Sequence, residues 1–183
     1  MVDLEPEEAV PALKGRGLDV MLTYEWDLLP RLADPGIEME ELLVERVFIA
    51  LPANHPLAAE NRPVSIAELS DEEWIVGRDS TSMLDLVGAA TRRYGYEPRT
   101  DFHSMDFSVI LAAVGAGLGV ALGPSLALVD ELPDVALREI SGFKLNRTIR
   151  MGIRSGSGSN PGLAAVLSAI RTAARAIEDR LSI

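Results

Sequence analysis

The chain has 183 residues, a formal net charge of −11 and a hydrophobic fraction of 48%. That length can bury a core, in one domain or in two small lobes. The negative charge disfavours direct binding to nucleic acid or to anionic membranes, and no segment stays apolar for the roughly 20 residues that a membrane span needs. Because the chain has no cysteine, disulfides and thiolate metal sites are excluded.

The predicted elements alternate between helices and strands, which is typical of an α/β fold. A short extended piece at 2–5 precedes the first helix, so we expect the strands on either side of that helix to be parallel. We predict helices at 6–14, 83–94, 106–117 and 161–181, and short helical turns at 65–69 and 124–130. We predict strands at 18–22, 41–51, 74–77, 99–103, 119–122, 135–140 and 148–153, and a loop at 27–37.

The most informative stretch is residues 106–124, DFSVILAAVGAGLGVALGP. Asp106 or Ser104 can cap a helix here, and Gly117 can end that helix by adopting a positive φ. The apolar run at 119–122 predicts a strand that is buried on both faces, as in a parallel sheet. Since these glycines follow a helix instead of a strand, they do not form a dinucleotide-binding turn.

The sequence offers no constellation of catalytic or metal-binding residues. His55 and His103 are the only histidines, and their spacing matches no zinc motif. No GxSxG motif marks a nucleophilic serine. The paired carboxylates lie at the starts of predicted helices, where capping explains them. We therefore expect a protein that is not an enzyme, with no catalytic residue, no metal and no cofactor.

Three groups of polar residues are better candidates for a binding site. Each is predicted to lie between the C-terminal end of a strand and the N-terminal end of a helix, where backbone N–H groups and hydroxyls can bind an anionic small molecule. Taken singly, each hydroxyl is more often a helix cap than a ligand contact. The predicted contacts are Thr23, Tyr24, Ser80, Thr81, Ser104, Met105 and Asp106.

Several motifs, in their order and spacing, resemble the effector-binding domain of LysR-type transcriptional regulators. They are LDVML, LVERVFIALPANHPLA, VSIAEL, the IVG strand and AAVGAGLGVALGP. The resemblance implies a two-lobed, periplasmic-binding-protein-like (type II) α/β fold, with lobe I at 1–47 and 149–183 and lobe II at 48–148. It also implies that a small-molecule effector binds between the lobes.

The resemblance further implies a cytoplasmic homodimer or homotetramer that reaches DNA only through a helix-turn-helix domain not found in this sequence. For self-association we expect helices 6–14 and 83–94 to take part, because Val10 and Leu13 need a cover. The first strand and helix of lobe I are also missing from the pattern, so we expect an incomplete lobe I in which strand 18–22 is weakly held. The alternative is a transporter's solute-binding protein, which has the same bilobal fold.

Overall fold

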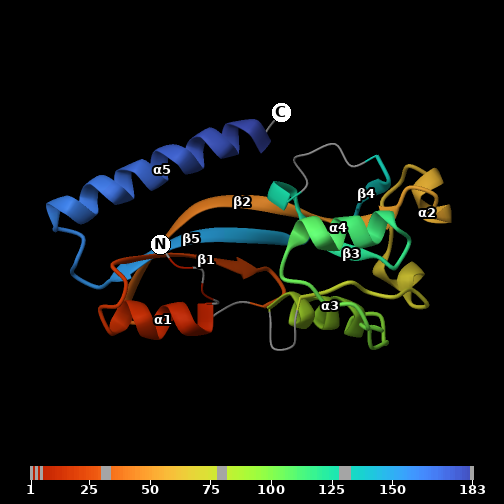
Figure 1. Ribbon diagram of the computed structural model, residues 1–183, viewed down its shortest axis with the longest axis horizontal. Coiled ribbons are helices and arrows are strands. Elements are labelled where there is room, and N and C mark those ends of the chain that lie inside the picture. Colours follow the sequence, from red (N-terminus) through yellow and green to blue (C-terminus); the bar gives the residue numbers. More distant parts are fainter. Residues whose placement is uncertain are drawn as a thin grey trace. The chain divides into compact units, whose positions relative to one another are not determined.

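The computed structural model describes residues 2, 4, 6–29, 34–77, 82–127 and 133–181. The chain divides into two compact units. Unit 1 comprises Met1–Val44 and Arg147–Ile183, and unit 2 comprises Glu45–Asn146. Two strands, β2 (Ile37–Pro52) and β5 (Asn146–Arg154), contain the boundaries between the units, so the chain passes from one unit to the other within regular structure (Figure 1).

Unit 1 is a small sheet with a helix on each face. Strand β1 (Val20–Trp26) pairs antiparallel with β5, and β5 lies next to β2. Helix α1 (Pro6–Lys14) packs Leu13 against Met21, whereas α5 (Pro161–Leu181) packs Leu167 against Met151. Met21 is the register partner of Gly152, which neighbours Met151 along β5. Because neighbouring residues of a strand point to opposite faces, the two helices cover opposite faces of the sheet.

The parallel pairing expected between the extended piece at 2–5 and the strand at 18–22 lies outside the described residues, because residues 3 and 5 are not described. This strand runs from Val20 to Trp26 and is antiparallel to β5, pairing Val20 with Ile153 and Trp26 with Arg147. Of the extended piece expected at 2–5, only residues 2 and 4 are described, and neither belongs to a helix or strand. The cover expected for Leu13 comes from unit 1 itself, because Leu13 is fully buried beside Met21 and Ile37.

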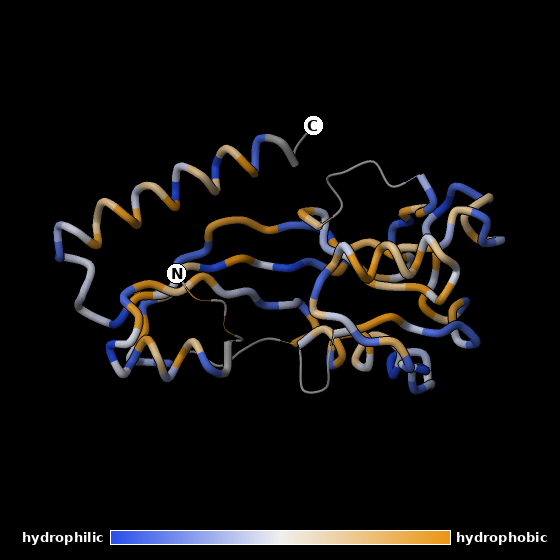
Figure 2. The backbone as a smooth tube through the Cα atoms, in the orientation of Figure 1, coloured by the Kyte–Doolittle hydropathy of each residue, from blue (hydrophilic) through white to orange (hydrophobic). Residues whose placement is uncertain are grey.

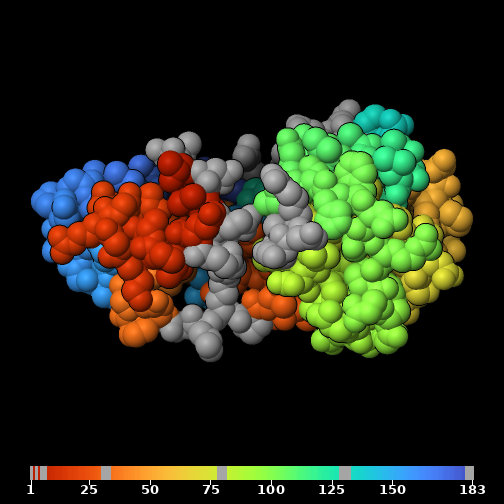
Figure 3. Space-filling model, turned by 60° about the horizontal axis from the view of Figure 1, so that its bottom comes forward, coloured from red at the N-terminus to blue at the C-terminus, as the bar shows by residue number. Residues whose placement is uncertain are grey.

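Unit 2 is a mixed α/β structure. Strand β2 pairs antiparallel with β3 (Ala121–Pro124) along one edge and with β4 (Val135–Glu139) along the other. Parallel bridges join Trp74 to Val120 and Val76 to His103. Its helical elements are α2 (Pro56–Ala59), η1 (Ile66–Leu69), α3 (Ser82–Arg92), α4 (Phe107–Gly115) and η2 (Ser125–Ala127). In Figure 3, α3 and the segment around α4 form a continuous surface over this unit.

Helix α4 follows the predicted start and stop signals. The Asp106 carboxylate accepts a hydrogen bond from the Ser108 N–H and caps the helix, and Gly117 has a φ of 77°. Figure 2 shows α4 as hydrophobic along its length, whereas α5 alternates between hydrophobic and hydrophilic turns. Accordingly, α4 is packed in the core of unit 2 through Ile110 and Val114, while most of α5 is exposed.

Other strand predictions for unit 2 need correction. The strand expected at 119–122 is buried on both faces, but its regular part, β3, is antiparallel to β2, and only Val120 makes a parallel bridge. The strands expected at 74–77 and 99–103 form isolated bridges only. The helix expected at 124–130 is the short η2, and residues 128–132 lie outside the described part.

Each unit contains one buried tryptophan. Trp26 of unit 1 is 3% exposed and Trp74 of unit 2 is 0% exposed.

In the residues that the structure describes, no helix has the length and apolar character needed to cross a membrane.

Candidate functional site

The predicted contacts in unit 2 gather at the start of α4. The Ser104 N–H donates to the Val76 carbonyl at 3.0 Å, which anchors the segment to the neighbouring bridge. The Ser104 hydroxyl oxygen accepts from the Asp106 N–H at 3.1 Å, and Met105 is 47% exposed. Ser104, Met105 and Asp106 thus lie together between a bridge and a helix N-terminus, as the sequence predicted.

Asp106 already supplies negative charge at this helix end. Its carboxylate accepts from both the hydroxyl (2.7 Å) and the N–H (2.8 Å) of Ser108. Both hydrogen bonds lower the pKa of Asp106, and the one from the Ser108 hydroxyl has the larger effect. A ligand carboxylate therefore gains little from the first free N–H groups of α4, because Asp106 occupies them.

His103, which precedes Ser104 in the sequence, adds a polar side chain that was not among the predicted contacts. Its Nδ1 lies 2.9 Å from the Gly77 carbonyl oxygen and its Nε2 lies 2.6 Å from the Thr100 carbonyl oxygen. Carbonyl oxygens only accept hydrogen bonds. The His103 ring thus contacts the backbone of Gly77 and Thr100 through both of its nitrogens. No spacing motif in the sequence signals this arrangement.

The predicted contacts in unit 1 lie within a strand and not beyond its end. Thr23 pairs with Arg150 and Tyr24 with Ile149, and the strand continues to Trp26. Thr23 is 7% exposed. As neighbours in a strand, Thr23 and Tyr24 point to opposite faces of the sheet.

Tyr24 belongs to an aromatic cluster with a cation above it. The rings of Tyr24 and Trp26 meet edge to face, with centroids 5.6 Å apart. The Arg147 guanidinium lies 5.6 Å from the Tyr24 ring and 5.5 Å from the Trp26 ring. Trp26 and Arg147 were not among the residues predicted from the sequence. The spacing of two between the aromatic residues, which places them on one face of a strand, is the signal that could have found Trp26.

The remaining predicted contacts, Ser80 and Thr81, lie outside the described residues. The two described groups belong to different units, Thr23 and Tyr24 to unit 1 and Ser104 to Asp106 to unit 2. Within the described ranges, no group of three or more His, Asp or Glu side chains could hold a metal ion.

A protein-family comparison matches residues 2–175 to the family described as LysR substrate binding domain. The small neutral protease regulatory protein of Streptomyces lividans is 35% identical over 121 residues, which are 62% of this chain and 33% of that protein. Transcriptional dual regulator GltC of Bacillus subtilis is 24% identical over 92 residues, 50% of this chain and 30% of that protein. The chain spans less than half of the length of these curated relatives.

Solved structures share the fold at low sequence identity. The Corynebacterium glutamicum OxyR C206 mutant aligns with a TM-score of 0.77 and 22% identity, covering 99% of this chain and 56% of that one. The BenM effector binding domain with its effector benzoate aligns at 0.73 and 20%, covering 93% and 76%. The effector binding domain of QuiR in complex with shikimate aligns at 0.74 and 18%, covering 94% and 79%. The fold is therefore the type II periplasmic-binding-protein-like fold of such domains.

Proposed function

The chain belongs to the LysR substrate-binding domain family, and from this premise we propose that it is the effector-sensing domain of a LysR-type transcriptional regulator. It binds a small molecule and thereby controls DNA binding by a helix-turn-helix domain outside this sequence. The family match over residues 2–175 carries this proposal. It favours a regulator over the solute-binding protein of a transporter.

We propose that the effector carries a carboxylate and that its contacts are the seven residues predicted from the sequence, Thr23, Tyr24, Ser80, Thr81, Ser104, Met105 and Asp106. Benzoate and shikimate, which accompany the BenM and QuiR domains, are both carboxylates. The Ser104 hydroxyl can donate a hydrogen bond to the carboxylate, whereas Asp106 already accepts from the Ser108 N–H at the start of α4. Tyr24 and the exposed Met105 suit an apolar body.

The remaining features of this proposal concern the whole protein. We propose a cytoplasmic homodimer or homotetramer that has no enzymatic activity and no cofactor. Its DNA contacts belong to the helix-turn-helix domain, because the acidic chain described here disfavours a polyanion. The named relatives support this assignment, since they are regulatory proteins.

Isothermal titration with benzoate and with shikimate tests the Ser104 contact. Ser104→Ala removes the hydroxyl, and Ser65→Ala is its matched control, because Ser65 caps η1 with a similar hydrogen bond to the Ala67 N–H. We expect Ser104→Ala to weaken carboxylate binding about tenfold, the size of one lost hydrogen bond to a charged group. Ser65→Ala should leave the affinity unchanged. Equal affinities for the two variants would remove Ser104 from the site.

A further inference from the structure

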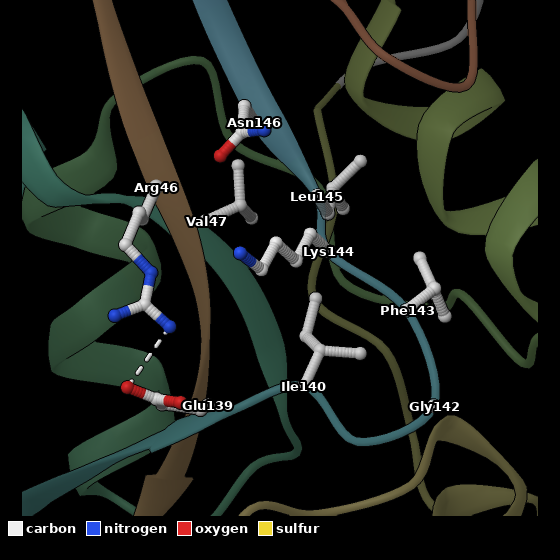
Figure 4. A pocket seen from close by; sticks show the side chains of 9 residues that line it. All are labelled: Arg46, Val47, Glu139, Ile140, Gly142, Phe143, Lys144, Leu145 and Asn146. Atoms are coloured by element: carbon white, nitrogen blue, oxygen red, sulfur yellow. Dashed lines mark ion pairs between the residues drawn. The ribbon is translucent and has the colours of Figure 1, made fainter.

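A pocket of about 280 Å³ opens in unit 2, away from the start of α4 (Figure 4). Its walls come from β2 at Arg46 and Val47, from the end of β4 and from the turn at 140–145 that leads into β5. This volume lies near the lower limit of ligand pockets, which run from roughly 300 to 1,000 Å³. The pocket is therefore suited to a small molecule.

The walls of this pocket are held by backbone hydrogen bonds. The Val47 N–H donates to the Leu145 carbonyl at 3.0 Å, which ties the turn to β2. The Ser141 N–H donates to the Val64 carbonyl at 2.8 Å, which ties the other end of the turn to the core. Gly142 turns the chain with a φ of 90°. A ligand would therefore meet a largely preformed site and would lose little affinity to ordering it.

The pocket has an excess of positive charge. Arg46 pairs with Glu139 at 2.9 Å, and Figure 4 shows the Lys144 side chain extending from the turn toward Arg46. Lys144 has no ion-pair or hydrogen-bond partner within the described part of the chain. The only other lysine of the sequence, Lys14, is paired with Asp34 at 2.9 Å. Two cations facing one carboxylate leave one net positive charge, in a chain whose net charge is −11.

Apart from Asn146, the remaining side chains that line the pocket are apolar. Val47 and Leu145 are 4% and 3% exposed, so their side chains are fixed by packing, and Ile140 is half-buried beside them. A cation next to an apolar wall matches a molecule with one carboxylate and a short apolar body. We infer that this pocket binds a small organic monocarboxylate, whose carboxylate pairs with Lys144 and whose body contacts Val47, Ile140 and Leu145.

Protein NMR of the whole chain with benzoate as the probe tests this inference. We expect benzoate to shift the backbone amide signals of residues 139–146. Lys144→Gln should weaken this binding about two- to fivefold, as expected for one solvent-exposed ion pair. The matched control is Lys14→Gln, which removes the other lysine. Lys14→Gln and Ser104→Ala, each made as a single variant, should leave the benzoate-induced shifts at 139–146 unchanged.

A second variant tests the apolar wall. Ile140→Ala should weaken benzoate binding at 139–146 but not acetate binding, because acetate lacks the larger apolar body. Inorganic phosphate shifting the same signals as strongly as benzoate would show a general anion site and would overturn the assignment to monocarboxylates. If Lys144→Gln bound benzoate with unchanged affinity, or if millimolar benzoate shifted no signal at 139–146, the proposal that this pocket binds a monocarboxylate through Lys144 would be wrong. These outcomes are independent of Ser104, so they do not decide the proposed effector contacts.

Discussion

The cores of the two units differ in how many large side chains they bury completely. Of the twelve largest fully buried side chains among the described residues, Leu13 alone lies in unit 1, and the other eleven, Trp74 and Leu122 among them, lie in unit 2. Both units leave large apolar side chains exposed, for example Leu22 at 58% in unit 1 and Leu118 at 52% in unit 2, so the difference lies in the buried side chains. Since burial of apolar area is the main stabilising term, unit 2 has the stronger core of its own.

The largest expected effect comes from deleting one leucine in each core. Leu122 in β3 is 1% exposed and Leu167 in α5 is 5% exposed. Leu122→Ala should lower the free energy of unfolding by about 3–5 kcal/mol, and Leu167→Ala by about 2 kcal/mol, because the site under α5 is less enclosed. Urea unfolding followed by circular dichroism measures both. An equal or reversed order would mean that the two cores are equally closed.

Hydrogen exchange compares the strands themselves. The Val120 N–H donates to the Glu73 carbonyl and its own carbonyl accepts from the Ile75 N–H, both at 2.8 Å, while β2 pairs with the following residues. Strand β1 pairs with β5, and no second partner strand is found for it in the described ranges. We expect amides at 119–122 to exchange at least about tenfold more slowly than those at 18–22. Equal, strong protection of both in a monomer would contradict the comparison.

Local signals in the sequence were sufficient for helices such as α4 and η1. The Asp106 cap and the positive φ of Gly117 depend on neighbouring residues only, and so does the Ser65 cap of η1. Strand direction depends on distant residues. Tyr24 pairs with Ile149, and nothing near Tyr24 in the sequence indicates whether its partner runs parallel or antiparallel. The helix before this strand suggested a parallel partner at 2–5, whereas the partner that the structure describes, β5, comes from the other end of the chain.

The candidate sites were likewise predictable only where their residues are close together in the sequence. Ser104 and Asp106 could be predicted as a group because both lie within the three residues before the start of α4. The pocket that joins Arg46 to Lys144 was not predicted, because these residues are far apart in sequence and each is unremarkable alone. Arg147 over Tyr24 was missed for the same reason. Tertiary folding, and not a motif, brings each pair together.

The smallest expected effect is a dependence on pH that compares one ion pair from each unit. In unit 2, hydrogen bonds from the Arg62 guanidinium and then from the Ser65 N–H lower the pKa of Glu68 to about 2, from an ordinary 4.5. In unit 1, the Arg171 guanidinium lowers the pKa of Glu40. A carboxylate with a lowered pKa stabilises the folded state above its ordinary pKa, and that stabilisation is lost as the pH falls toward the folded value.

Glu68→Gln and Glu40→Gln should each lower the Tm at pH 7 by about 1–3 °C, since both pairs are exposed to solvent. The effect of Glu68→Gln should be the larger, because Glu68 also accepts from the Ser65 N–H in the capping box. Differential scanning calorimetry from pH 7 down to pH 2 should show the Glu68→Gln deficit shrinking below about pH 4.5. If the lowering of Tm by Glu68→Gln did not change with pH, its cause would be lost packing and not lost charge.

The placement of one buried indole in each unit gives the protein two built-in optical reporters. Trp26 lies under the Arg147 guanidinium in unit 1, and Trp74 lies in the core of unit 2. The tryptophan emission of a Trp74→Phe variant comes only from unit 1, and that of a Trp26→Phe variant only from unit 2. The red shift of this emission on exposure to water then records the unfolding of each unit separately, within one chain that holds both units and without any attached dye.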